Sequence, residues 1–480
     1  MKKLLSIVII LALLSSMCSC GIFSKDVPPD DLPDESPDTE QKPIPSLNGS
    51  PLSDYVIVYD AEGLDYNKRA AEYIKSTAFD RHGVELEIVD DGTAEAEREI
   101  VVGETSRAIS AELDENTEGF EFSILTKDGD IALEADYFVI AAAVYYFMDT
   151  YLTDGNESYV TPDGVSIHEP VVKEAKSFIL LIGDGMGVYQ TKLYDYLSDE
   201  SEYSDGEGSF YGYMFPYHGF SRTRSLSGVT DSAAGGTALS TGYKTYNEYV
   251  GLDKNGNPIK NLSELAGELG KASAVMSTEN KTGATPASFS SHAYNRDDSS
   301  DILTSQAELT AKHGTVIDCG YDYYTARYMK SIEKHITDTL TKVSADEDGF
   351  FLMYEEAHID KHCHDNDLGD TFLAVIRFNQ AIARFMEYAF YNPDTAVIIT
   401  ADHETGGITE NADGSLAYTT KEHTAADVPV FAWGMGLDFF DGKTVENVEI
   451  GKYIAAMMGV SDFGDSSNDW YDLIYGENKE

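Results

Sequence analysis

The chain has 480 residues, of which 42% are hydrophobic, and 34 Lys and Arg stand against 84 Asp and Glu, for a formal net charge of −50. This length allows two or three domains with real hydrophobic cores. The negative charge argues against nucleic acid as a binding partner, because such binding depends on Lys and Arg that neutralise phosphates. An anionic substrate would need strong local positive charge, from metal ions or arginine at the site.

The first 20 residues are typical of an export signal. Two lysines precede an apolar run, Leu4 to Leu14, that is too short to span a bilayer as a permanent helix. The ending resembles a bacterial lipoprotein signal, in which a cysteine after the apolar run is lipidated and becomes the mature N-terminus. Cys20 fits this role best, Cys18 competes with it, and an ordinary secretory signal is the alternative. We therefore expect an extracytoplasmic protein at a bacterial cell surface, either membrane-anchored or secreted.

Residues 21–53 are expected to form a disordered tether, because they are rich in Pro, Asp, Glu and Ser and have almost no large apolar residue. Residues 54–170 then predict a small α+β domain. Its expected strands are 55–60, 84–89, 98–103, 120–125 and 131–135, and its expected helices are 67–83 and 135–152. The element order and the phrase EIVVGETSR resemble the accessory domain that precedes the barrel in some bacterial hexosaminidases and glucuronidases. A spacer role and a glycan contact both stay open for it.

Residues 174–480 predict a larger domain of the α/β class. It begins with KSFILLIGDGMG, an apolar run into a glycine-rich turn, which suits a central parallel strand buried on both faces. Further apolar runs lie at 271–280, 314–320, 350–356, 395–400 and 428–434, and they alternate with helical patterns such as 301–313 and 369–390. This alternation predicts an α/β sandwich with ligands at the carboxyl ends of its strands.

Acids, histidines and one serine fall at these expected strand ends. They are Asp184 in IGDGMG, Ser232 in VTDSAAGGTALSTG, Thr285 and Arg296 in TGATPASFSSHAYNR, Glu355, Asp360 and His364 in EEAHIDKHCHDND, Asp402 and His403 in ITADHETGG, and His423 in KEHTAADVPVFAWG. The four-residue spacing of Asp360 and His364 puts both side chains on one face of a helical turn. Each segment alone is a weak signal that a solvated loop would also explain. Their joint occurrence is informative.

At these residues the sequence closely resembles the alkaline phosphatases, with every segment between about 177 and 436 in family order. The resemblance implies a three-layer sandwich with a mostly parallel central sheet, and hydrolysis of phosphate monoesters through a phosphoserine at Ser232. It implies one zinc ion on Asp360, His364 and His423, a second on Asp184, Asp402, His403 and Ser232, and a third ion, usually magnesium, on Asp184, Thr285 and Glu355. Nitrogen and carboxylate ligands suit catalytic zinc, and oxygen ligands suit magnesium.

Two basic residues would bind the phosphate. Arg296 would hold two phosphate oxygens with its planar fork, and Lys361, directly after Asp360, would bring an ammonium group near the bound phosphate. Ser232 is expected at the N-terminus of a helix, where free N–H groups favour an anion.

The sequence departs from the family pattern in two places. Larger members carry Asp or His two residues before the threonine, where this chain has Gly283, which implies a weak, exchangeable magnesium ion. Nineteen residues separate His403 from His423, where larger members insert a dimer-forming subdomain, so the case for a dimer is weakened.

Other functions stay open. A metal-dependent phosphodiesterase of the same superfamily would place a second ester group where Arg296 should bind phosphate. A sulfatase would need a C/S-x-P-x-R frame, which does not occur in the chain. A surface glycan-binding lipoprotein with an inactive catalytic domain is the remaining alternative. The stretch DKNGNP at 253–258 resembles a calcium loop, but proline replaces its essential glycine, so we expect a hairpin turn. Cys319 and Cys363 would form at most one bridge.

Overall fold

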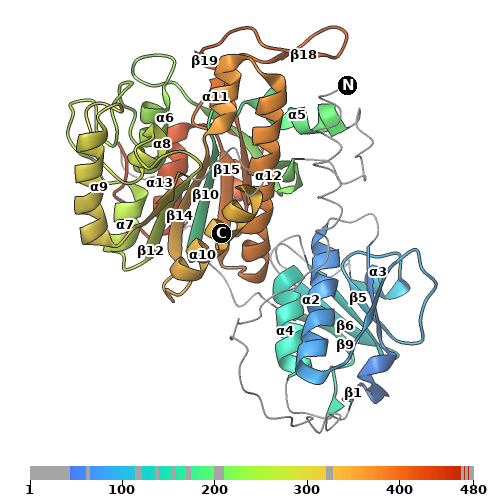
Figure 1. Ribbon diagram of the computed structural model, residues 1–480. Coiled ribbons are helices and arrows are strands. Elements are labelled where there is room, and N and C mark those ends of the chain that lie inside the picture. Colours follow the sequence, from blue (N-terminus) through green and yellow to red (C-terminus); the bar gives the residue numbers. More distant parts are fainter. Residues whose placement is uncertain are drawn as a thin grey trace, which may run out of the picture. The chain divides into compact units, whose positions relative to one another are not determined.

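The computed structural model describes residues 44–60, 65–113, 122–135, 140–153, 158–168, 175–198, 210–320, 328–465, 470 and 474. Two main sheets organise them, one of six strands within 56–168 and one of eight strands within 177–446 (Figure 1). The predicted export signal, with Cys18 and Cys20, lies outside the described residues. In the described part of the chain, no helix combines the length and the apolar character needed to cross a membrane.

The prediction of a disordered tether is wrong at its C-terminal end. Strand β1 (Ser46–Leu47) pairs with β2 (Ser50–Pro51) and also, in parallel, with β8 (Ser158–Tyr159). The reason is local apolar content, since Leu47 is fully buried and anchors this small sheet. The rest of the predicted tether, 21–43, lies outside the described residues.

The six-stranded sheet is mixed. Its strands lie in the order β4 (Glu87–Asp90), β3 (Val56–Tyr59), β5 (Glu99–Val102), β7 (Asp130–Ala135), β6 (Phe122–Lys127) and β9 (Gly164–His168). The first four are parallel, and β6 is antiparallel to both of its neighbours. Helices α2 (Asp65–His82) and α4 (Ile140–Tyr151) pack on one face and α3 (Ala108–Leu113) on the other. The strands and helices expected in this part of the sequence are present, and its boundary near 170 stays a prediction.

The eight-stranded sheet is mostly parallel, as the sequence predicted. Its order is β13 (Val316–Cys319), β12 (Ala272–Ser277), β14 (Phe350–Glu356), β10 (Ser177–Gly183), β15 (Thr395–Thr400), β20 (Val428–Trp433), β11 (Tyr217–Arg222) and β21 (Thr444–Glu446). The first five strands run parallel. Strand β20 is antiparallel to both β15 and β11.

Helices cover both faces of this sheet and complete a three-layer sandwich (Figure 1). Helices α10 (Tyr328–Val343) and α12 (Leu368–Tyr391) lie on one face, and α6 (Ser232–Thr241), α7 (Leu262–Glu268) and α13 (Asn447–Met457) lie on the other. Side chains of β10 alternate between the two cores, with Ile179 and Leu181 on the α12 side and Leu180 and Ile182 on the α7 side. Burial on both faces explains why this strand is apolar at nearly every position.

Strand register brings the functional segments to one edge of the sheet. Glu355 pairs with Ser277 of β12 and with Ile182 of β10, and Ile182 pairs with Thr400 of β15. The residues that follow these strands therefore meet at their shared carboxyl ends, as expected for ligands of an α/β sheet.

The DKNGNP stretch forms a turn, as predicted. The Asp253 carboxylate accepts hydrogen bonds from the backbone N–H groups of Asn255 and Asn257, both at 2.8 Å. Leu252 forms a bridge with Pro258 across it. The Asp253 oxygens are thus engaged by the turn itself.

Candidate active site

Ser232 begins the buried helix α6, as expected. The residue before it, Asp231, caps the helix by accepting a hydrogen bond from the N–H of Ala234 at 2.9 Å. All ten residues of α6 are buried, because the sequence SAAGGTALST has only one side chain larger than threonine. The serine hydroxyl therefore stands at a buried helix N-terminus, where free N–H groups favour an anion.

The Ser232 hydroxyl faces a buried cluster of histidine and carboxylates. Its Oγ lies 3.2 Å from His403 Nε2. The same nitrogen lies 3.3 Å from Asp402 Oδ2 and 3.6 Å from Asp184 Oδ1. Both of these carboxylate oxygens are buried and have no hydrogen-bond partner among the described residues. Buried carboxylate oxygens of this kind fit a cation that neutralises them.

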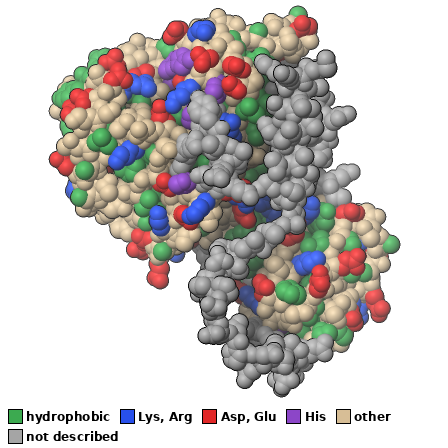
Figure 2. Space-filling model, in the orientation of Figure 1, with side chains coloured by type: hydrophobic (Ala, Val, Ile, Leu, Met, Phe, Trp, Pro, Cys, Tyr) green, Lys and Arg blue, Asp and Glu red, His purple; other side chains and the backbone are tan. Residues whose placement is uncertain are grey.

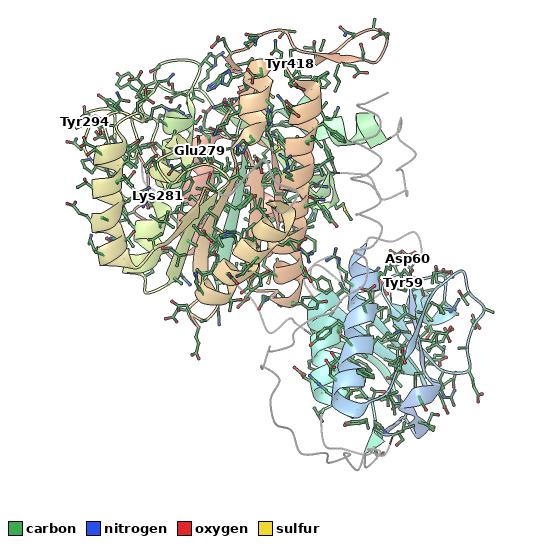
Figure 3. The ribbon with its side chains drawn as sticks, viewed as in Figure 1. Tyr59, Asp60, Glu279, Lys281, Tyr294 and Tyr418 are labelled. Atoms are coloured by element: carbon green, nitrogen blue, oxygen red, sulfur yellow. The ribbon has the colours of Figure 1, made fainter. Side chains whose placement is uncertain are left out.

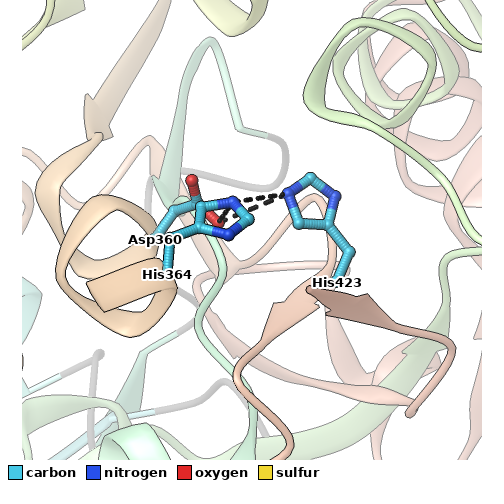
Figure 4. A group of neighbouring side chains, drawn as sticks. All are labelled: Asp360, His364 and His423. Carbon is cyan, nitrogen blue, oxygen red and sulfur yellow. Dashed lines mark hydrogen bonds and ion pairs between the residues drawn. The ribbon is translucent and has the colours of Figure 1, made fainter. Parts of the chain in front are cut away.

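A second ligand group consists of Asp360, His364 and His423 (Figure 4). His364 Nε2 lies 3.3 Å from Asp360 Oδ1 and 3.1 Å from His423 Nε2, and His423 Nε2 lies 3.5 Å from Asp360 Oδ1. The first two residues lie four apart on α11 (His358–Asp365), which confirms the expected helical spacing. Two nitrogens and a carboxylate converge here, a set that suits zinc.

A short ladder brings His423 to the group. Strand β19 (His423–Thr424) is antiparallel to β16 (Glu404–Thr405), so His423 pairs with Thr405. Its imidazole stacks on that of His403 with 3.6 Å between ring centroids. The ladder thus links the two ligand groups, and the ligand atoms of Asp184, Asp360 and His403 also lie within 4.8 Å of one another.

The glycine-rich turn after β10 allows this close approach. Gly185 has φ +72°, and a Cβ there would lie 2.9 Å from Asp360 Cα. A side chain would separate the turn that carries Asp184 from α11. Gly185 therefore allows direct contact between two segments that carry candidate ligands.

The candidate third cation site is formed by Asp184, Thr285 and Glu355. Thr285 lies on α8 (Ala284–Ser288), and its hydroxyl is buried without a hydrogen-bond partner among the described residues. The same holds for Glu355 Oε1, whereas Glu355 Oε2 accepts a hydrogen bond from the Ser277 hydroxyl. These oxygens fit a hard cation such as magnesium.

Burial and neighbouring negative charges raise the pKa values of two carboxylates in the site, Asp184 and Glu355. Burial first, and then the charge of Asp402, raises the pKa of Asp184 well above its ordinary value. Burial and then the charge of Glu279 raises the pKa of Glu355 to about 8. Burial would also raise the pKa of Asp360, but its hydrogen bonds with His364 and Thr405 and the charges of His403 and His423 together outweigh burial and hold this pKa below its usual range. The hydrogen bond with Asp360 raises the pKa of His364 to about 9.

The two basic residues lie beside the ligand groups. Arg296 Nη1 lies 3.3 Å from Asp231 Oδ2, and its backbone N–H donates to the Glu248 carbonyl at 3.0 Å. Lys361 Nζ lies 2.6 Å from Glu279 Oε1. In the space-filling view, histidine side chains lie among acidic and basic ones on the part of the surface that carries α11 (Figure 2).

Sequence reasoning missed Asp231 and Glu279. An acid directly before the SAAGG helix is a recognisable N-cap pattern, so a signal for Asp231 was available. Glu279 gave no signal, because its role depends on a tertiary contact with Lys361.

The two cysteines of the described chain are both free. Cys363 is buried, and its Sγ lies 3.7 Å from Gln190 Nε2 and 3.8 Å from the Tyr418 hydroxyl. The single bridge left open by the sequence is therefore not formed. His358, at the start of α11, has its Nδ1 3.2 Å from Glu356 Oε1, and this contact links the helix to the end of β14.

Comparisons with known proteins identify the family of this chain. The alkaline phosphatase family model matches residues 175–323 and 325–417. Alkaline phosphatase 3 of Bacillus subtilis is 32% identical over 326 residues, which cover 57% of this chain and 70% of that protein. Alkaline phosphatase 4 of the same organism is 28% identical, and the match covers 57% of this chain and 71% of that protein.

Solved structures give the same answer. The alkaline phosphatase from the Antarctic bacterium TAB5 is 27% identical, with a TM-score of 0.51, and the match covers 60% of this chain and 99% of that one. A second structure is a histidine-to-aspartate mutant of that enzyme with Mg bound in the M3 site. It is 26% identical, with a TM-score of 0.51, and the match covers 61% of this chain and 100% of that one.

The fold and these relatives define a metal-dependent phosphatase of the α/β class. The chain belongs to the alkaline phosphatase family and is an enzyme that hydrolyses phosphate monoesters. The family match begins at residue 175, so the likeness of 54–170 to a glycosidase accessory domain stays a prediction.

Proposed function

We propose that this protein is an extracytoplasmic, lipid-anchored alkaline phosphatase that forms a phosphoserine at Ser232, with two zinc ions and one magnesium ion at its site. The observation that carries the proposal is the Ser232 hydroxyl at the buried start of α6, 3.2 Å from His403 Nε2. That nitrogen also lies 3.6 Å from Asp184 Oδ1 and 3.3 Å from Asp402 Oδ2, two buried oxygens that accept no hydrogen bond from any described residue. A serine in these surroundings suits phosphoryl transfer.

The proposed ligand sets follow the three clusters. One zinc would be held by Asp360, His364 and His423, the other by Asp184, Asp402, His403 and the Ser232 oxygen, and magnesium by Asp184, Thr285 and Glu355. When bound, the ions supply positive charge that lowers the pKa of the serine hydroxyl and of water and offsets charge on the leaving oxygen.

The chain's own residues then carry out two displacements. Ser232 Oγ, without its proton, attacks phosphorus, so that an Oγ–P bond forms while the ester O–P bond breaks, and the released alkoxide takes a proton from water. Water next attacks the phosphorus and gives up a proton, the Oγ–P bond breaks, Ser232 Oγ leaves as the alkoxide and takes up that proton, and inorganic phosphate is released. Arg296 and the free N–H groups of α6 hold the phosphate oxygens throughout. Asp231, whose Oδ2 lies 3.3 Å from Arg296 Nη1, would restrict the motion of the guanidinium.

The anchor rests on the sequence before the described residues. Cys20 follows the apolar run and would carry the lipid, and residues 21–43 would form the tether. The domain at 54–170 would act as a spacer or contact surface glycans.

An activity panel tests the proposed reaction. The purified mature protein should turn over p-nitrophenyl phosphate faster than bis-p-nitrophenyl phosphate, because the fork of Arg296 would bind two oxygens of a phosphate dianion. A metal chelator should abolish both activities, and zinc should restore them. Faster turnover of the diester would favour the related phosphodiesterase class, and activity that survives exhaustive chelation would reject the metal sites.

A further inference from the structure

The third cation site has no side chain at Gly283, but the Glu279 side chain occupies the space that a side chain at this position would take. A Cβ at Gly283 would lie 2.7 Å from Glu279 Oε2, 2.8 Å from its Cγ and 2.9 Å from its Cδ. Contacts this short do not occur between real side chains, so the Glu279 carboxylate already occupies the volume that a residue at 283 would need. Glu279 lies just past the carboxyl end of β12, in the segment that leads to α8 (Figure 3).

Glu279 is held in this position from two sides. Its Oε1 lies 2.6 Å from Lys361 Nζ, and Lys361 follows the zinc-ligand candidate Asp360 on α11. Its backbone N–H donates to the Ser277 hydroxyl at 2.8 Å, and that hydroxyl donates to Glu355. Glu279 is therefore held relative to α11, which carries the zinc-ligand candidates Asp360 and His364, and relative to Glu355 of the third cation site.

The second carboxylate oxygen is available for a ligand. With Oε1 bound to Lys361, Oε2 lies on the Gly283 side and makes no hydrogen bond to any described residue. The nearby hydroxyl of Thr285 and Glu355 Oε1 are also without partners among the described residues. Oxygens of this kind, on the β12–α8 segment and on β14, are the ligand chemistry of magnesium.

We propose that Glu279 supplies the carboxylate of the third cation site that the chain lacks at Gly283, and that Lys361 holds it in place. This proposal rests on the proposed function, because it adds Glu279 to the magnesium site proposed there. The carboxylate acts on magnesium directly or through one of the waters that magnesium retains. The weak site expected from Gly283 alone is then replaced by a tighter one.

Magnesium binding to the zinc-loaded full chain tests this assignment. The affinity is measured by calorimetry and the zinc content by elemental analysis, so neither readout depends on turnover. Glu279→Gln keeps the shape of the side chain and removes its charge, and it should weaken magnesium at least about tenfold while two zinc ions remain. Glu268→Gln is the matched control, since Glu268 is paired with Lys260 in the same manner at the end of α7 and should change neither value.

A positional exchange makes the test sharper. Gly283→Asp alone should bring no gain in magnesium affinity over the wild type, because its Cβ would displace the Glu279 carboxylate that already serves the site. The double variant Glu279→Ala with Gly283→Asp should recover binding, because the new carboxylate then has the space. Recovery shows that the double variant folds and that the site needs one carboxylate, supplied from position 279 or from position 283.

The outcomes separate this proposal from the proposed function. Unchanged magnesium affinity in Glu279→Gln, with zinc at two per chain, overturns the proposal. The same result with a raised KM would mean that Glu279 only positions Lys361, which also overturns it. A wild-type chain that binds no zinc and hydrolyses no monoester would instead contradict the proposed function.

Discussion

Asp231 and Arg296 form an ion pair in which Asp231 Oδ2 lies 3.3 Å from Arg296 Nη1. The other oxygen of the same carboxylate accepts a hydrogen bond from the Ala234 N–H at 2.9 Å and caps α6. One side chain thus fixes both the helix that presents Ser232 and the guanidinium proposed to bind phosphate. A substitution of Asp231 should therefore change the free energy of unfolding through loss of the Oδ1 cap, and substrate binding through loss of the Oδ2 contact with Arg296.

Asp231→Asn and Asp231→Ala separate these two effects. Asparagine is a good N-cap, so we expect the asparagine variant to keep its free energy of unfolding, whereas alanine should lower it by about 1 kcal/mol. Both variants lose the charge that holds Arg296, so both should raise KM for a phosphate monoester. Denaturant unfolding and steady-state kinetics measure the two effects. Equal KM values in both variants and the wild type would contradict the role given to the ion pair.

The metal-free protein should lose stability as the pH rises. Glu355 has an ordinary pKa of 4.5 and a pKa of about 8 in the fold, so the folded state binds more protons between these values. Its contribution to stability is complete below about pH 4.5 and is lost as the pH rises through 8. His364, raised to about 9, acts in the same direction.

Thermal unfolding at pH 5 and pH 8 measures this effect. The Tm of the chelated protein should be lower at pH 8, and the difference should shrink in metal-free Glu355→Gln, which has no charge to bury. Metal-loaded protein should not show the fall, because the bound cations neutralise the carboxylates. A Tm of the metal-free wild type that rises between these pH values would show that other groups dominate.

The lipid anchor is tested at Cys20. Expressed in a bacterium with lipoprotein processing, the wild-type protein should partition into detergent. Cys20→Ala should release the protein or stall its processing, and Cys18→Ala should have no effect. Wild-type protein recovered only from the medium, with an unmodified N-terminus, would refute the anchor.

The edge of the sheet that carries the candidate ligands was predictable, because Asp184, Glu355 and Asp402 stand at the ends of apolar strands and parallel strands end at one edge. The register confirms that their strands are neighbours, whereas the assignment of each residue to a metal came from the resemblance to the family. Helix α6 was predictable from its run of small residues after an N-cap acid. These features are local in sequence.

The features that were missed depend on tertiary contacts. The burial of Leu47 pulls residues 46–51 into a small sheet, although their composition is that of a tether. Glu279 fills the space above Gly283 because Lys361, 82 residues away, holds it there. A gap in a family pattern gives no indication of which distant side chain fills it.

The covalent step at Ser232 is the central claim, and phosphate labelling tests it directly. Wild-type enzyme mixed with radiolabelled inorganic phosphate at acid pH should trap a phosphoserine by reversal of its hydrolysis, and peptide mapping should find the label on Ser232 alone. Ser232→Ala should bind no label and lose most turnover while its fold remains intact. Label on another residue, or full activity of Ser232→Ala, would contradict the mechanism.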